Sequence, residues 1–125
     1  MSAGGFLRNR DGGTAIEFAL TAPVFFLLVI GAVEVGLLCW AQVALQQGSE
    51  AAARCATVNK TVCGSAAQIK SYASAQSYGL APPVTAFTVS TPACGNRVQA
   101  SYSPPFVNAF VMSGVTLTAS ACFPV

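Results

Sequence analysis

The side chains of this chain that could carry chemistry are above all its five cysteines and four acidic residues, since the sequence contains no histidine and Lys60 and Lys70 lack an acidic neighbour that would position them. Ser-His and Cys-His nucleophiles are therefore excluded. Beyond residue 41, Glu50 is the single acidic residue, so that part of the chain has no pair of carboxylates for acid–base catalysis. A thiol–disulfide enzyme would need a Cys-x-x-Cys pair, and the sequence has none. We therefore predict no enzyme, no cofactor and no small-molecule substrate.

Four of the cysteines, Cys55, Cys63, Cys94 and Cys122, lie in the distal part of the chain. An even number of cysteines in a small domain indicates two disulfides and an oxidising compartment. Three pairings are possible. We favour Cys55–Cys63, which closes a short loop, together with Cys94–Cys122, which closes a long one. Zinc is disfavoured because closely spaced ligand pairs and histidine are both missing, so no metal is predicted. Cys39 is interpreted as an apolar filler, with a palmitoylation site or an intermolecular bridge as the alternatives.

The N-terminal third contains a segment that is apolar enough to cross a membrane. Phe18–Val33 is sixteen residues without a charge, Glu34 interrupts it, and Val35–Ala41 continues it. Sixteen helical residues rise about 24 Å, which is short of a hydrocarbon core of about 30 Å, so a full span takes in a glutamate at one end. We predict a transmembrane helix over 13–41, with membrane lipid as its partner. Glu34 is either an interfacial glutamate that reaches headgroup water or a paired, functional residue.

The orientation of this segment is predicted from basic residues and cysteines. Arg8 and Arg10 lie close to its N-terminal end, whereas the next basic residue, Arg54, lies 13 residues beyond Ala41. This asymmetry favours a cytoplasmic N-terminus, and the cysteines place 42–125 in the periplasm or another extracytoplasmic space. A cleavable secretory signal is the alternative, but the apolar run is long and no small-x-small site follows it closely.

The order of helical and strand patterns along the sequence predicts an α+β fold. Helix formers continue past the membrane segment, so one long helix from about Thr14 to about Ala56 becomes a stalk. Ser65 is a cap for a second short helix over 66–78, with Ala66, Ile69 and Ala73 as its apolar stripe, and Gly79 would end it.

After Pro82-Pro83 the apolar period changes from 3.6 to 2. Three strands of a small antiparallel sheet are predicted at Val84–Ser90, Arg97–Tyr102 and Gly114–Cys122. The first two join through a turn with Pro92 and Gly95-Asn96, and Tyr102–Ser113 is a loop. If the second and third strands pair antiparallel, Cys94, just before the second strand, lies beside Cys122, at the end of the third. The layout is a helical stalk with the sheet packed beside it.

Composition excludes nucleic acid as a partner. Charged residues are 8% of the chain and the net charge is only +2. An ordinary soluble domain has about 25% charged residues. The sequence has no basic stripe with interleaved aromatics, which a nucleic-acid binder would need.

The residues around the start of the apolar run resemble a known processing site. Gly12–Phe18 reads Gly-Gly-Thr-Ala-Ile-Glu-Phe, which is similar to the site of type IV prepilins of the Flp (tight adherence) class, where cleavage follows a glycine. The wider pattern resembles TadE-like pseudopilins: it comprises Glu17–Leu20, Pro23, Gly31–Gly36 and the Ala-Ala-Arg run Ala52–Arg54.

The resemblance implies a leader, residues 1–12, that a prepilin peptidase removes by cutting between Gly12 and Gly13. It also implies that Glu17, followed by Phe18, meets the N-terminal amine of a neighbouring subunit. The alternative places Glu17 simply at the cytoplasmic interface. Glu34 is the second candidate for assembly.

The function that the resemblance implies is that of a minor pseudopilin in the assembly of a Flp-type pilus or a related secretion system. It would be a single-pass protein of the bacterial inner membrane, with other pilins and pseudopilins as partners and with incorporation into the pilus. The alternative is a single-pass membrane-anchored extracytoplasmic binding or scaffold protein that never enters a filament.

Overall fold

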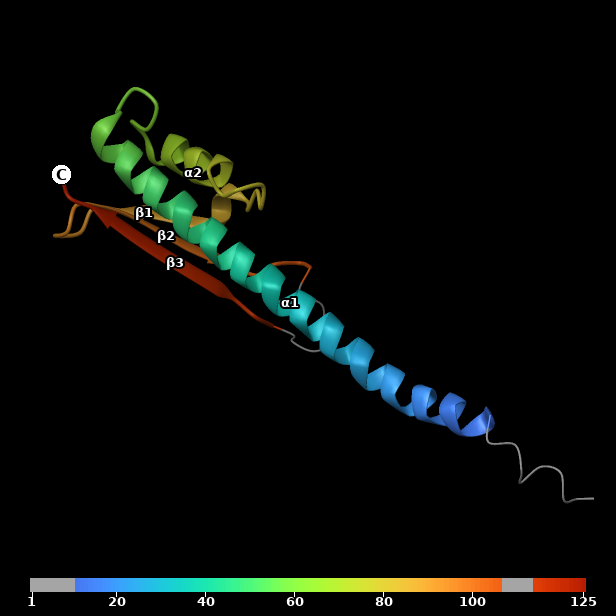
Figure 1. The fold of residues 1–125 in the computed structure, drawn as a ribbon. Helices are drawn as coiled ribbons and strands as arrows, with labels where there is room; N and C mark the ends of the chain where they lie inside the picture. Colours follow the sequence, from blue (N-terminus) through green and yellow to red (C-terminus); the bar gives the residue numbers. More distant parts are fainter. Residues whose placement is uncertain (1–10, 107–113) are drawn as a thin grey trace, which may run out of the picture. The chain divides into compact units, whose positions relative to one another are not determined.

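The computed structural model describes residues 11–106 and 114–125 (Figure 1). By internal contacts the chain divides into two units, Met1–Val35 and Gly36–Val125, which are described separately below. The elements are α1 Asp11–Val58, α2 Ala66–Ala75, the short 3-10 helix η1 Val84–Ala86, and strands β1 Phe87–Ser90, β2 Asn96–Tyr102 and β3 Leu117–Phe123. The predicted α+β class, with a long first helix, a short second helix and a three-stranded sheet, is confirmed.

Helix α1 begins three residues before the predicted start and ends two residues after the predicted end. It continues through Pro23. The rest of the predicted leader, residues 1–10, lies outside the described residues, and so does most of the predicted loop Tyr102–Ser113.

The start of α2 was predicted correctly. Ser65 is the N-cap: its hydroxyl accepts a hydrogen bond from the Gln68 amide (3.3 Å), and the Gln68 side chain in turn accepts one from the Ser65 amide (3.1 Å). This reciprocal pair satisfies two helix-end donors at once. Of the predicted apolar stripe, Ile69 and Ala73 are buried, whereas Ala66 is exposed.

The predicted end of α2 was wrong, because the helix stops at Ala75 rather than at residue 78. Tyr78 and Gly79 both have positive φ angles, 41° and 76°, which no α-helix tolerates. The buried Ser77 hydroxyl donates to the Ala73 carbonyl (2.7 Å), so this last segment folds back onto the helix.

The three strands form one antiparallel sheet in the order β1-β2-β3. Its register aligns Phe87 with Ala100 and Val98 with Ala121. The two outer strands are shorter than predicted. Val84–Ala86 is a 3-10 turn instead of a strand, because the amide of Ala86 bonds back to the carbonyl of Pro83 (2.9 Å).

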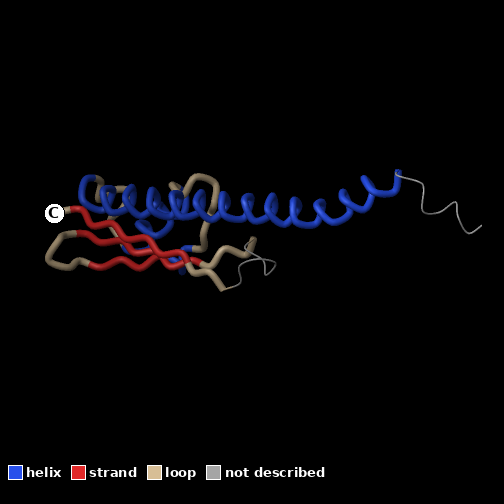
Figure 2. The backbone as a smooth tube through the Cα atoms, turned by 60° about the horizontal axis from the view of Figure 1, so that its bottom comes forward, coloured by secondary structure: helices blue, strands red, loops and turns tan. Residues whose placement is uncertain are grey.

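One face of the sheet and both helices share a single core within the Gly36–Val125 unit. In Figure 2 the part of α1 in this unit lies above the three strands, and the buried side chains of α1, α2 and the sheet belong to one cluster. Its main members are Leu45, Ala52, Ala53, Ala56, Ile69, Ala73, Phe87, Val98, Ala100 and Ala119. The opposite face is polar and exposed, with Thr88, Gln99, Thr118 and Ser120. The predicted packing of the sheet beside the stalk is confirmed.

Candidate functional site

The N-terminal part of α1 presents an apolar surface that nothing in the described chain covers. It holds an 18-residue window that is long and apolar enough to cross a membrane, and only 6% of this window is buried. Phe18, Phe25 and Leu28 are 72%, 62% and 69% exposed. The core helix of a soluble protein would bury such side chains. This single apolar helix therefore indicates single-pass membrane anchoring.

The residues of the predicted processing site lie in the first two turns of α1. Gly12 and Gly13 are exposed, and a Cβ added to either would meet nothing within 4 Å. Glycine weakens a helix by about 1 kcal/mol per residue, so this first turn opens easily. Glu17 and Phe18 follow and are also exposed, with one helical turn, about 6 Å along the axis, between Gly13 and Glu17.

Glu34 does not join these residues, because it lies seventeen positions beyond Glu17, about 25 Å further along the helix. Its side chain is half-buried, and its Oε2 is buried without a hydrogen-bond partner in residues 11–106 and 114–125. Gly31, one turn earlier, has open space where a Cβ would stand. A carboxylate held away from water needs a proton or a cation as a partner.

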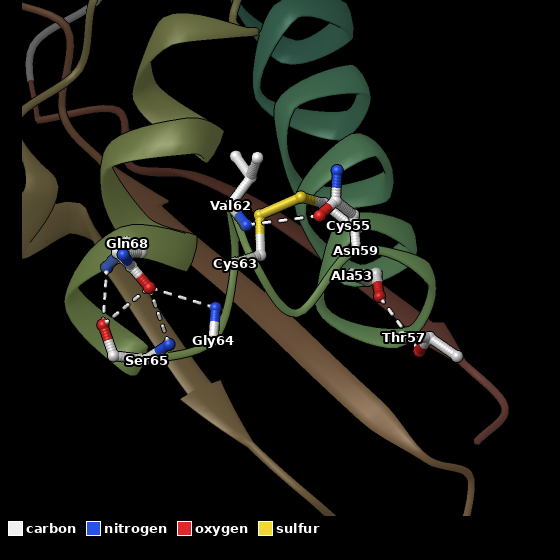
Figure 3. Close-up of a disulfide and its surroundings, with 9 residues drawn as sticks. All are labelled: Ala53, Cys55, Thr57, Asn59, Val62, Cys63, Gly64, Ser65 and Gln68. Atoms are coloured by element: carbon white, nitrogen blue, oxygen red, sulfur yellow. Dashed lines mark hydrogen bonds between the residues drawn. A yellow bond between two sulfur atoms is a disulfide. The ribbon is translucent and has the colours of Figure 1, made fainter.

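The first disulfide joins the end of α1 to the loop before α2. Cys55 and Cys63 are bonded, with their Cα atoms 5.8 Å apart, so this predicted pairing is correct (Figure 3). Between them, the Asn59 carbonyl accepts from the amide of Cys63 (2.9 Å) and its side-chain Oδ1 accepts from that of Val62 (3.3 Å). The capping box at Ser65 follows directly, so the disulfide and the cap together set where α2 begins.

The second disulfide joins the turn between β1 and β2 to the end of β3. Cys94 and Cys122 are bonded, with Cα atoms 6.3 Å apart, and this pairing was also predicted. Gly95, at φ 119°, packs against the carbonyl of Phe123 so closely that a Cβ would clash. The turn therefore depends on glycine at this position.

We expect the second disulfide to contribute more stability than the first. Loop-closure entropy increases with loop length, and the sequence separations are 28 and 8 residues. Replacing Cys94 and Cys122 by serine should cost about 3.6 kcal/mol, against about 2.5 kcal/mol for Cys55 and Cys63. Urea unfolding of the full chain in detergent, followed by circular dichroism, would measure both. Equal losses, or a larger loss for the short loop, would contradict the ranking.

Two glutamines of α1 tie this helix to the free edge of β3, and the sequence analysis missed them. Gln42 Nε2 donates to the carbonyl of Thr118 (2.7 Å) and Gln46 Nε2 to that of Ser120 (3.4 Å). An exposed strand edge invites pairing with other chains, and these side chains partly occupy it. Gln42 and Gln46 are four residues apart and therefore lie on the same face of α1, which is the sequence signal that could have identified them.

Beyond Gln46, a cleft of about 1070 Å³ opens between α1, α2 and β3. Glu50 and Arg54 are the charged residues that line it, with Tyr72 and Phe123 among the apolar ones. A single carboxylate without histidine supplies no acid–base pair. Among the described residues there is also no group of three or more potential metal ligands.

The pattern along α1 agrees with a family comparison. Residues 12–54 match the TadE-like protein family. The matched segment starts at Gly12 of the predicted processing site, includes Glu17 and Glu34, and ends at Arg54, next to the first disulfide cysteine. Neither a search of curated proteins nor a search of solved structures found a match.

The TadE-like segment thus contains the apolar helix and all candidate residues for processing and assembly. The disulfide-bonded sheet and α2 lie outside it. The suspected family resemblance is confirmed for this segment.

Proposed function

We propose that this chain is a minor pseudopilin that takes part in the assembly of a Flp-type (tight adherence) pilus or a related secretion system. The TadE-like match and the single apolar helix together indicate a membrane protein related to the Tad pilus. The observation that carries the finer proposal is the run Gly12-Gly13 followed one turn later by Glu17-Phe18, exposed at the start of that helix.

In this proposal a prepilin peptidase cuts the bond between Gly12 and Gly13. The cut removes residues 1–12, with Arg8, Arg10 and Asp11, and turns the Gly13 amide nitrogen into an amine. Glu17, one turn away, then offers its carboxylate to the amine of a neighbouring subunit. Each charge offsets the other in the membrane, whereas an unpaired one is penalised.

Glu34 is a second assembly residue in the proposal. Its buried Oε2 without a hydrogen-bond partner supports a positively charged group on a neighbouring helix as its counterpart. The open space at Gly31 would admit that helix closely.

The chain is placed in the bacterial inner membrane with its N-terminus in the cytoplasm. Two disulfides in residues 42–125 support an oxidising compartment for this part, which is the periplasm. From there the disulfide-bonded domain would enter the pilus together with the helix.

The proposal is tested by changing the scissile bond. Gly12→Leu places a bulky side chain where the peptidase must reach the backbone, so we expect the leader to stay attached. Gly5→Leu makes the same change within the leader, away from the bond, and should be processed normally. Immunoblotting with a tag at the C-terminus separates the two forms. Normal trimming of Gly12→Leu would contradict the site.

A further inference from the structure

The Gly36–Val125 unit has one end at which its part of α1 begins. Within this unit α1 and β3 run in the same direction, because Gln42 bonds to Thr118 and Gln46 to Ser120. The start of β3 is therefore level with the start of the unit's helix. Leu117 pairs with Tyr102, so the end of β2 lies there too.

An aromatic pair joins the chain after β2 to α1 at this end. The ring of Phe106 lies with its centroid 6.4 Å from that of Trp40, at an interplanar angle of 40°. Around this pair, large apolar side chains of α1 remain open to solvent: Trp40 is 43% exposed and Val43 57%. Pro105, next to Phe106, is exposed as well. We call Trp40, Val43, Pro105 and Phe106 the proximal apolar patch.

The charged residues that α1 and the sheet contribute to this unit, Glu50, Arg54 and Arg97, lie away from the patch. Glu50 and Arg54 follow Gln46 on α1 by one and two turns, and Arg97 pairs with Cys122 near the far end of β3. From Val35 to Ser49, and again from Val98 to Val125, the sequence has no charged residue.

We propose that the proximal apolar patch rests in the headgroup region of the bilayer, so that the domain contacts lipid through Pro105 and Phe106 as well as through α1. Tryptophan and other amphipathic rings concentrate at this depth of a membrane. Trp40 and Val43 follow the apolar stretch of α1 in the sequence, and none of the four residues of the patch carries a charge that lipid contact would dehydrate. The proposal rests on membrane anchoring and is independent of leader cleavage and of pilus assembly.

The chain has a single tryptophan, which makes the contact measurable. In the double variant Trp40→Phe/Phe106→Trp the reporter lies in the patch. In the matched control Trp40→Phe/Phe123→Trp the reporter lies at the far end of β3, six residues or about 20 Å from the start of that strand at Leu117. Both full chains are reconstituted in nanodiscs of phosphatidylcholine and phosphatidylglycerol, with and without lipids that carry a nitroxide next to the headgroup.

We expect the reporter of Trp40→Phe/Phe106→Trp to emit at shorter wavelength than the reporter of Trp40→Phe/Phe123→Trp and to be quenched severalfold more strongly by the nitroxide lipid. If the Phe106→Trp substitution disturbs the fold, Trp40→Phe/Pro105→Trp provides a second reporter at an exposed position of the patch. Its emission and quenching should differ from those of the Phe123→Trp control in the same direction. Equal quenching at positions 106 and 123 would overturn the proposal. Emission at short wavelength without lipid quenching would overturn it too, because protein would then cover the patch.

Discussion

Glu17→Gln should abolish incorporation of this chain into pili while leaving it in the membrane. Glutamine keeps the size of the side chain and removes its charge, so the amine of a neighbouring subunit would be left without a counterion. Breaking a buried charge pair on one side costs about 3 kcal/mol, or about a hundredfold in affinity between subunits. Quantitative immunoblotting of sheared pili and of the membrane fraction would measure the two outcomes separately.

Glu50→Gln is the matched control for this variant. Glu50 is also exposed on α1, but it lies in the distal unit and accepts a hydrogen bond from Gln46 (2.8 Å). Its neutralisation should leave incorporation unchanged. If Glu17→Gln entered pili as efficiently as Glu50→Gln, a charge pair at Glu17 would have no part in assembly.

Gly48→Ala should destabilise the disulfide-bonded domain by about 2 kcal/mol, the middle of the range for an overpacked core. The added Cβ would stand 2.6 Å from the carbonyl oxygen of Ala73 and against the hydroxyl of Ser77, so α1 and α2 would have to move apart. Because the Ala73 oxygen belongs to the backbone of α2, no rotamer change relieves the contact. Thermal unfolding of the full chain in detergent should show a melting temperature lower by about 10 °C.

Gly36→Ala is the matched control, because it makes the same substitution on the same helix at a position where an added Cβ has open space. A Cβ at Gly36 meets nothing within 4 Å, and alanine is the better helix former by about 1 kcal/mol. The melting temperature of this control should stay the same or rise slightly. Equal melting temperatures for the two variants would contradict the close approach of α1 and α2 at Gly48.

Local patterns in the sequence predicted much of the distal domain. The Ser65–Gln68 spacing predicted the start of α2, because a capping box needs only residues that are near in sequence. The apolar period of 2 predicted the third strand, in which Ala119 is buried and Ala121 half-buried. Antiparallel pairing of the last two strands then favoured the Cys94–Cys122 bond, which the structure contains.

The features that were missed depend on contacts between distant segments. From the sequence alone, Gly48 only lowers the helix propensity of α1. Its role becomes clear from the structure, in which α2 packs closely against it. The reach of Gln42 to β3 likewise depends on tertiary packing across 76 positions. The first strand was predicted too long because the double proline starts a 3-10 turn, and Ser74 bonds to the carbonyl of Pro82 (2.6 Å).

For the candidate site, the family resemblance contributed more than periodicity did. Apolar composition alone predicts a span and leaves Glu17 as an unexplained charge near its end. The order of glycine, glutamate and aromatic residue resembles a prepilin processing site, which implies a role for this charge, and the TadE-like match begins at the same glycine.

The central claim, that this chain is a pseudopilin processed at its N-terminus, is tested most directly by the intact mass of the protein. Mass spectrometry would be applied to the chain purified from membranes of piliated cells and of cells that lack the prepilin peptidase. We predict that the mature protein begins at Gly13 in piliated cells, and that residues 1–12 remain when the peptidase is absent. A chain that retains residues 1–12 in cells with functional pili would contradict the pseudopilin mechanism and favour a membrane-anchored scaffold that stays outside the filament.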